Sequence, residues 1–121
     1  MIRSEPSPAF SSDNTLAGGT LGNLLFGRGG NDYLNAGGGQ DYLEGGAGAD
    51  VFLFTRGQAN GDTVLDFTPG QDRLGFIGYG LGGFAQVDAY HWVVNSADGT
   101  THETIGFSTA LSITPADFFF I

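Results

Sequence analysis

Large apolar residues recur at every ninth position through the N-terminal half of the chain, at Leu16, Leu25, Leu34, Leu43 and Phe52. Each lies at the centre of a short segment whose two flanking residues point the other way, as in a three-residue strand. The glycine-rich segments between them supply the positive φ values and close chain approach of tight turns. The pattern predicts coils of two turns and two strands, stacked into two short parallel sheets with the apolar column between them.

A second column of nine-residue period, made of Asp and Asn, stands two positions before each apolar residue. Its members are Asn14, Asn23, Asp32, Asp41 and Asp50. Because two turns complete one coil, alternate members stack on the same edge. We therefore expect Asn14, Asp32 and Asp50 on one edge, and Asn23 and Asp41 on the other.

The same order of an acid, one residue and an apolar residue continues beyond the regular repeats, with small insertions. Asp62-Thr63-Val64 follows Asn60-Gly61, and Asp72-Arg73-Leu74 follows Pro69-Gly70-Gln71. Counting turns predicts that Asp62 stacks on Asp41 and that Asp72 stacks on Asp50.

The nine-residue period ends after about residue 75, and a different pattern follows. Phe76–Gly83 is predicted to be a glycine-rich loop. Tyr90–Asn95 and Thr100–Phe107 alternate as strands on either side of a turn, which predicts a hairpin. Thr114–Asp117 has the Thr, Pro and Asp of a helix start, and Phe118–Ile121 is predicted to be a buried last strand.

These elements together predict an all-β fold. It is a parallel β-roll, that is, a two-sheet solenoid of nonapeptide repeats, with a C-terminal antiparallel β cap that an open-ended solenoid needs. The expected divisions are a disordered lead-in over residues 1–12, the roll over 13–77 and the cap over 78–121.

Charge and composition reduce the range of possible functions. The net charge of −9 argues against binding to nucleic acid or to an anionic membrane surface. The apolar runs are too short for membrane insertion, and the absence of cysteine excludes a disulfide. The thirteen acids include ten Asp, a bias toward short carboxylates that suits tight turns holding a hard cation.

The stacked carboxylates themselves predict a bound ion. Asp side chains on adjacent strands lie about 5 Å apart, and like charges at that distance must either protonate or hold a cation. Carboxylate and carbonyl oxygens suit calcium, whereas Mg²⁺ rarely accepts an all-protein cage. No Cys or His lies in the repeats, which disfavours zinc and copper there. The alternative, a flexible glycine-rich linker, does not explain an apolar residue kept in phase.

Three consecutive copies of a nine-residue phrase, GRGGNDYLN, AGGGQDYLE and GGAGADVFL, occupy residues 27–53. This array resembles the RTX (repeats-in-toxin) nonapeptide family, whose G-G-x-G-x-D-x-U-x repeat binds Ca²⁺. The segment GADVFLFTRGQANGDTVLDFTPGQDRLGF resembles the end of the β-roll in serralysin-type proteases and in the R-modules of mannuronan C5-epimerases. The closing ITPADFFFI resembles the C-terminus of those proteins, which belongs to a type I secretion signal.

The resemblance implies a set of calcium ligands, namely the repeat Asp side chains and the carbonyls at the second and fourth repeat positions. About three to five Ca²⁺ ions are expected. Asn14 and Asn23 imply weaker sites because they are neutral, and Asp62, Asp66 and Asp72 are expected as closing ligands. The remaining ligands implied are Arg28, Gly30, Asp32, Gly37, Gly39, Asp41, Gly46, Gly48 and Asp50.

No catalytic set is expected. His102-Glu103-Thr104-Ile105-Gly106 begins like HExxH but has Gly where the second His of a zinc protease must stand. His91 and His102 are expected at outward positions of the hairpin. Tyr33 and Tyr42 are expected to point outward, where they pack on the turn edges or stack on sugars.

The leading hypothesis is a non-catalytic module that folds on binding Ca²⁺ and serves an extracellular bacterial protein as its C-terminal type I secretion and stabilising module. Its expected partners are Ca²⁺ and an ABC-type exporter. The alternative is a polysaccharide-binding module like the alginate-binding R-modules of an epimerase or lyase. Those modules meet an anionic polymer with basic residues, and the low number of Arg in this chain counts against that alternative.

Overall fold

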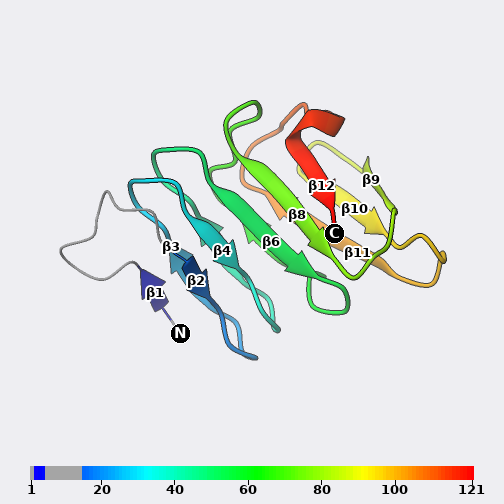
Figure 1. The fold of residues 1–121 in the computed structure, drawn as a ribbon, viewed down its shortest axis with the longest axis horizontal. Helices are drawn as coiled ribbons and strands as arrows, with labels where there is room; N and C mark the ends of the chain where they lie inside the picture. Colours follow the sequence, from blue (N-terminus) through cyan, green and yellow to red (C-terminus); the bar gives the residue numbers. More distant parts are fainter. Residues whose placement is uncertain (1, 5–14) are drawn as a thin grey trace.

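The computed structural model describes residues 2–4 and 15–121, and it consists of two β-sheets packed face to face (Figure 1). Seven strands form one sheet in the order β1-β3-β5-β7-β11-β10-β9, and five form the other in the order β12-β8-β6-β4-β2. The strands of the roll are β1 (Ile2–Ser4), β2 (Thr15–Ala17), β3 (Leu24–Phe26), β4 (Tyr33–Asn35), β5 (Tyr42–Glu44), β6 (Val51–Thr55), β7 (Thr63–Val64) and β8 (Arg73–Ile77). The remaining elements are β9 (Gly83–Gln86), β10 (His91–Asn95), β11 (His102–Phe107), the 3₁₀ turn η1 (Pro115–Asp117) and β12 (Phe118–Phe120).

The regular repeats form the coil that their period predicts. Strands β2 to β5 are three residues long and alternate between the two sheets. Successive strands within a sheet are parallel, with Leu16 opposite Leu34 and Leu25 opposite Leu43. The central residue of each strand is buried, because it faces the opposite sheet across the narrow interior.

The register continues across the two insertions. Leu43 of β5 lies opposite Val64 of β7, and Phe52 of β6 lies opposite Leu74 of β8. The extra residues are therefore absorbed in the turns, and the apolar column stays in phase.

The C-terminal part extends both sheets of the roll. Strand β11 pairs in parallel with β7, and β10 and β9 follow as antiparallel neighbours. Strand β12 pairs in parallel with β8 at the end of the other sheet. The predicted all-β class, with a parallel roll and an antiparallel hairpin in the cap, is confirmed.

Three local predictions differ from the structure. The predicted loop over 76–83 begins only at Gly78, because β8 runs on to Ile77, and Gly83 already belongs to β9. The last strand is partly buried instead of fully buried, and Ile121 is exposed. Ile2–Ser4 form β1 against β3 within the expected disordered lead-in, whereas the other residues of 1–12 lie outside the described part.

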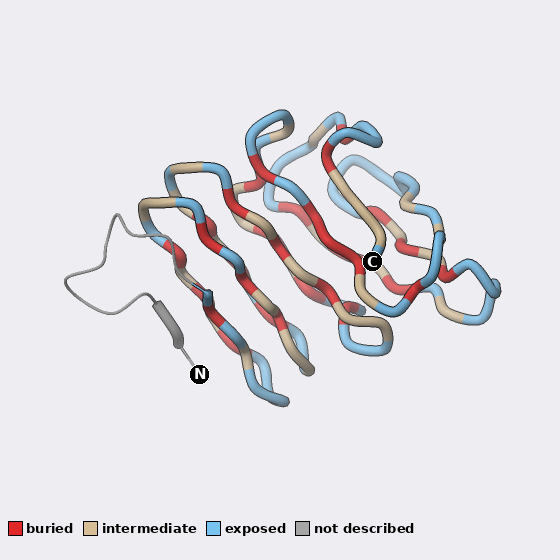
Figure 2. The backbone as a smooth tube through the Cα atoms, viewed as in Figure 1, coloured by how far each residue is buried: buried red, intermediate tan, exposed pale blue. Residues whose placement is uncertain are grey.

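Buried positions run along the strands of both sheets (Figure 2), and the residue types that fill the core change along the molecule. Its first part is the column of buried leucines, one from each strand. At the other end lies an aromatic cluster in which Phe76 contacts the rings of Phe54, Tyr79, Phe84 and Phe120. Aromatic side chains therefore fill the interior at this end of the molecule.

Within the described residues, no helix has the length and apolar character needed to cross a membrane.

Candidate calcium-binding edges

Two columns of polar side chains lie along the turns of the roll, at the start of the strands. We call the column of Asp32, Asp50 and Asp72 the first edge, and the column of Asn23, Asp41 and Asp62 the second edge. All six residues are buried. The stacking of Asp62 on Asp41 and of Asp72 on Asp50 agrees with the count of turns, whereas Asn14 lies outside the described residues.

On the first edge, the carboxylates of Asp50 and Asp72 each bind the backbone of the preceding coil. The N–H of Asp32 donates to Asp50 Oδ1 at 2.9 Å, and the N–H of Asp50 donates to Asp72 Oδ1 at 2.9 Å. A short side chain in this position therefore satisfies the amide at the beginning of the strand below it.

The second edge repeats this arrangement. The N–H of Asn23 donates to Asp41 Oδ1 at 2.7 Å, and the N–H of Asp41 donates to Asp62 Oδ1 at 2.8 Å. Among the described residues, the second edge begins with Asn23, which is neutral. Its side chain donates to the carbonyl of Leu21.

In three of these carboxylates the second oxygen has no such partner. Among the described residues, Oδ2 of Asp41, Asp50 and Asp62 is buried and accepts no hydrogen bond. A buried charged oxygen without a partner is costly. A hard cation with an affinity for oxygen removes that cost, so the donor set fits Ca²⁺.

Burial also changes the acidity of these groups. Desolvation raises the pKa of Asp50 to about 7 and that of Asp62 to about 8. The neighbouring carboxylates of Asp72, Asp32 and Asp66 raise the Asp50 value further. Desolvation likewise raises the pKa of Asp41 and of Asp72. Without a cation, burial therefore favours the protonated form of these carboxyl groups in the folded state.

The turn positions expected to offer carbonyl ligands have the left-handed backbone of tight turns. Arg28 has φ 69° and is the one non-glycine residue with positive φ among the described residues, while the other positions are glycines. A side chain at Gly46 would collide with the Arg28 carbonyl oxygen, and one at Gly48 with the Gly30 carbonyl oxygen. The turns therefore stack closely, one coil apart. The Gly48 carbonyl accepts a hydrogen bond from the Gln71 amide.

The first glycine of a repeat makes room for the acid of the same repeat. A Cβ at Gly27 would lie 2.7 Å from Asp32 Oδ2, and a Cβ at Gly45 would overlap the Asp50 carboxylate. Ala36 takes this position in the middle repeat and is itself buried. The sequence departs here from the glycine pattern without loss of the coil.

Asp66 and Asp117 close the end of the roll through turn amides. Asp66 accepts from the N–H groups of Gly45 and Gly46, at 2.8 and 2.6 Å. It therefore lies at a turn, and its charge reaches Asp50 and Asp72. The buried Asp117 accepts from the Gly70 N–H at 2.8 Å and from Thr114. Sequence reasoning identified Asp117 only as a helix-start residue, because nothing local indicates its distant partner.

The histidines and tyrosines singled out by sequence are not members of either edge. Tyr33 and Tyr42 are exposed, as predicted, at 50% and 49%. His91 contacts Asp88, and His102 contacts Asn95, both at exposed positions of the hairpin. Over residues 2–4 and 15–121, no three His, Cys, Asp or Glu side chains converge on one metal position.

Comparison with known proteins matches the repeats to a family. Residues 10–35 and 17–52 match the model of the RTX calcium-binding nonapeptide repeat. A search of curated proteins finds no match.

Two solved structures have a similar fold. One is the AlgE6R3 subunit of the Azotobacter vinelandii mannuronan C5-epimerase, 26% identical over 94% of this chain and 81% of that chain, with a TM-score of 0.55. The other is the AlgE6R2 subunit of the same enzyme, 23% identical over 99% of this chain and 91% of that chain, with a TM-score of 0.57.

Proposed function

Since residues 10–52 of this chain carry RTX calcium-binding nonapeptide repeats, we propose that Ca²⁺ bound along the two edges drives the folding of the roll. The observation that supports this most directly is the buried, unpartnered Oδ2 atom of Asp41, Asp50 and Asp62. Asp41 and Asp62 lie one coil apart on the second edge and Asp50 lies on the first edge, so both edges present a demand for positive charge.

The proposed ligands combine carboxylates with backbone carbonyls. Two Asp side chains at most would serve one ion, so turn carbonyls complete the six to eight oxygens that Ca²⁺ takes. Asp66 and Asp72 would contribute at the end of the first edge. The remaining proposed ligands are Asn14, Asn23, Arg28, Gly30, Asp32, Gly37, Gly39, Asp41, Gly46, Gly48, Asp50 and Asp62.

Bound Ca²⁺ supplies the positive charge that allows neighbouring carboxylates to stay ionised inside the fold. Without it, the glycine-rich turns impose a large entropy cost that a single column of leucines does not offset. The binding energy is then folding energy. We assign residues 13–77 to this calcium-dependent roll and 78–121 to the cap.

A fold that forms only when Ca²⁺ is bound is compatible with export of the chain in its unfolded state. Where Ca²⁺ is scarce, as in a bacterial cytosol, the chain would stay unfolded and could pass through an ABC-type exporter. Residues 112–121 would be its secretion signal. Outside the cell, Ca²⁺ at the level of weak extracellular sites would fold the roll. We therefore propose a secreted, extracellular module without a catalytic role of its own, which stabilises the protein that carries it.

Circular dichroism with and without Ca²⁺ tests the folding proposal. In EGTA at pH 8 we expect loss of the part of the β-sheet spectrum that the roll contributes, and titration with Ca²⁺ should restore it cooperatively, with about three to five ions counted by native mass spectrometry. Mg²⁺ at the same concentration serves as the control and should not restore the spectrum. A full β spectrum in EGTA at pH 8 would overturn the proposal.

Export needs its own test. The chain expressed beside a type I exporter should be recovered from the medium, and a variant that lacks residues 112–121 should remain in the cells. Equal recovery of both forms would contradict the proposed secretion signal.

A second candidate, binding of an anionic polysaccharide, is favoured by the similarity to the epimerase subunit AlgE6R3. The arginines give it little support. Arg56 forms an ion pair with Asp98 at 3.0 Å, and the Arg73 guanidinium lies 4.9 Å from the centre of the Phe119 ring. Calorimetric titration of the calcium-loaded chain with alginate oligomers tests it, and heats equal to dilution would exclude it.

A further inference from the structure

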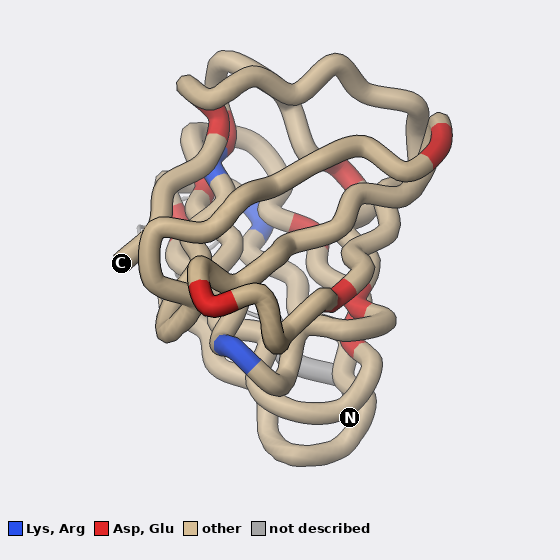
Figure 3. Tube along the Cα trace, turned by 90° about the vertical axis from the view of Figure 1, so that its right-hand side faces the viewer, with Lys and Arg blue, Asp and Glu red and all other residues tan. Residues whose placement is uncertain are grey.

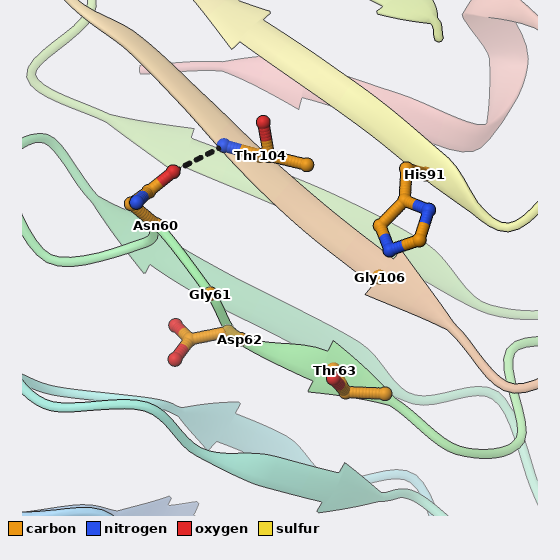
Figure 4. A pocket seen from close by; sticks show the side chains of 7 residues that line it. All are labelled: Asn60, Gly61, Asp62, Thr63, His91, Thr104 and Gly106. Carbon is orange, nitrogen blue, oxygen red and sulfur yellow. Dashed lines mark hydrogen bonds between the residues drawn. The ribbon is translucent and has the colours of Figure 1, made fainter. Parts of the chain in front are cut away.

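A polar hollow of about 380 Å³ lies on the outer face of the seven-stranded sheet, across β7 and β11. Figure 4 shows the His91 ring on one side of it and Asn60 on the other, with Gly106 and Thr104 between them. Its volume falls within the range of small-molecule sites, roughly 300–1,000 Å³. We call it the β7–β11 hollow.

Strand register explains why the sheet is hollowed here. Thr63 lies opposite Gly106, and Gly106 lies opposite His91. These residues face outward, because their neighbours Val64, Phe107 and Trp92 are buried. Gly106 brings no side chain to the row, and a Cβ at that position would lie 3.3 Å from Thr63 Oγ1 and 3.8 Å from the His91 ring. Because Gly106 has no side chain, the backbone of β11 at this position forms the floor of the hollow.

The row continues to an aromatic residue on the other side. Tyr42 lies opposite Thr63 across β5 and β7, and it is 49% exposed. Tyr42 and His91 thus stand at the two ends of the row, with only the small Thr63 and Gly106 between them. Flat rings at both sides of a shallow polar floor offer apolar surface to a ligand that lies across the strands.

The polar groups of the hollow are neutral hydrogen-bonding groups. Thr63 and Thr104 contribute hydroxyls, each a donor and an acceptor. Asn60 Oδ1 accepts from the Thr104 N–H at 2.9 Å, which directs the Asn60 amide nitrogen to be the donor to a ligand. His91 Nδ1 contacts Asp88 at 2.8 Å, so in the neutral ring Nδ1 donates to Asp88 and Nε2 is the acceptor.

Charge selects among polar ligands. Among the described residues, no Lys or Arg lines the hollow, and the carboxylate of Asp62, which also lines it, is buried and accepts from the Asp41 N–H. Figure 3 shows acidic positions outnumbering basic ones in the chain, whose net charge is −9. An anionic ligand would meet repulsion without a compensating ion pair, whereas a neutral polyhydroxyl ligand uses the hydroxyl, amide and imidazole groups present.

We propose that the β7–β11 hollow binds a segment of an uncharged polysaccharide, with one sugar ring over Gly106 and its neighbours against Tyr42 and His91. The hollow adjoins the second edge at Asp62, but the groups proposed to bind the sugar belong to other residues. Sugar binding here also differs from binding of an anionic polymer, because it discriminates against carboxylates.

The test compares sugars by NMR titration of the calcium-loaded, ¹⁵N-labelled chain. The neutral probes are β-1,4-mannohexaose, cellohexaose and xylohexaose. The matched anionic probe is the β-1,4-mannuronate hexamer, which differs from mannohexaose by a carboxylate in place of each hydroxymethyl group. We expect at least one neutral hexamer to shift the amides of Thr63, Thr104 and Gly106, with binding at least tenfold tighter than the mannuronate hexamer.

Variants locate the site. Gly106→Val fills the floor without requiring an unusual backbone conformation and should weaken binding of that neutral hexamer about tenfold. Tyr42→Ala should also weaken it, whereas Tyr33→Ala, the equally exposed residue at the same repeat position of the other sheet, should not. A full calcium-dependent β spectrum for each variant shows that it is folded.

Several outcomes would overturn the proposal. One is the absence of shifts with all three neutral hexamers. Another is equal or tighter binding of the mannuronate hexamer, which would indicate an anionic polymer as ligand. A third is unchanged affinity in both folded variants, Gly106→Val and Tyr42→Ala, which would place binding on a different surface.

Discussion

The regular coils and the C-terminal cap are held together by different interactions. A coil contributes one leucine-sized side chain from each strand, and its buried edges carry carboxylates. The cap surrounds Phe76 with aromatic rings whose centres lie 4.9 to 6.3 Å away. The comparison indicates that hydrophobic burial is enough for the cap, whereas the coils need ions to offset the repulsion and desolvation of their own acids.

Removal of Ca²⁺ should separate the two regions most clearly. In EGTA at pH 8, the amides of Leu25, Leu34 and Leu43 should lose their protection from hydrogen exchange, while those of Val94 and Ile105 keep measurable protection. The reason is that only the coils depend on charge neutralisation. Hydrogen-exchange mass spectrometry measures both regions at once. Equal loss, or equal retention, in the two regions would break the distinction.

Truncation of Phe76, the residue of β8 at the centre of the aromatic cluster that the cap covers, should have the next largest effect. Phe76→Ala removes a fully buried ring and should lower the free energy of unfolding by about 3–5 kcal/mol in saturating Ca²⁺. Phe119→Ala, at a half-buried outward position of the neighbouring strand, should cost about 1 kcal/mol or less. Urea unfolding measures both. A similar loss for the two variants would show that the aromatic cluster is not the stabilising contact between the roll and the cap.

Neutralisation of one edge carboxylate should affect calcium more than structure. Asp62→Asn keeps an Oδ1 acceptor for the Asp41 N–H but removes the charge, so the affinity for Ca²⁺ should fall about tenfold, or about 1.4 kcal/mol. The control, Asp88→Asn, changes an exposed acid and should leave the affinity unchanged. Calorimetric titration with Ca²⁺ gives the result. An unaltered affinity in Asp62→Asn would remove Asp62 from the ligand set.

Without Ca²⁺, the stability of the fold should decrease as the pH rises, which is the opposite of the pH dependence of stability in most acidic proteins. The pKa of Asp50 is raised to about 7 and that of Asp62 to about 8, against about 3.9 in an unfolded chain. The folded form therefore binds more protons between these values, and its stability falls as pH rises through the raised pKa values. In EGTA, the β signal in circular dichroism should be stronger at pH 5 than at pH 8.

Saturating Ca²⁺ should flatten this dependence, because the ion keeps the carboxylates ionised in the folded form. A calcium-free β signal that grows from pH 5 to pH 8 would contradict the buried state of these acids.

The smallest effect is expected at Arg28. Its φ of 69° is a left-handed conformation that costs a side-chain-bearing residue about 1–2 kcal/mol. Arg28→Gly relieves this strain but gives the unfolded chain more freedom, so a net gain of about 0.5–1 kcal/mol is expected. The thermal midpoint in Ca²⁺ measures it. A lower midpoint would show that the arginine side chain contributes more than its backbone strain costs.

The sequence by itself determined the coil and the order of its edges. Its nine-residue period identifies Leu25 as an interior position and Asp41 as an edge position, and both follow locally because each coil stacks on an equivalent one. The same count placed Asp62 above Asp41 despite an insertion, as the hydrogen bond between them confirms. The ligand roles of the edge residues remain a proposal.

Only the tertiary structure decided how the non-repeating parts join the roll. Strand β11 pairs with β7 and β12 with β8, and Asp117 reaches the Gly70 amide 47 positions away in sequence. The β7–β11 hollow likewise needs Thr63 and His91 to meet across Gly106. No sequence period links these segments. Their contacts form at the last coil of the roll, where β11 and β12 cover sheet edges that would otherwise be exposed.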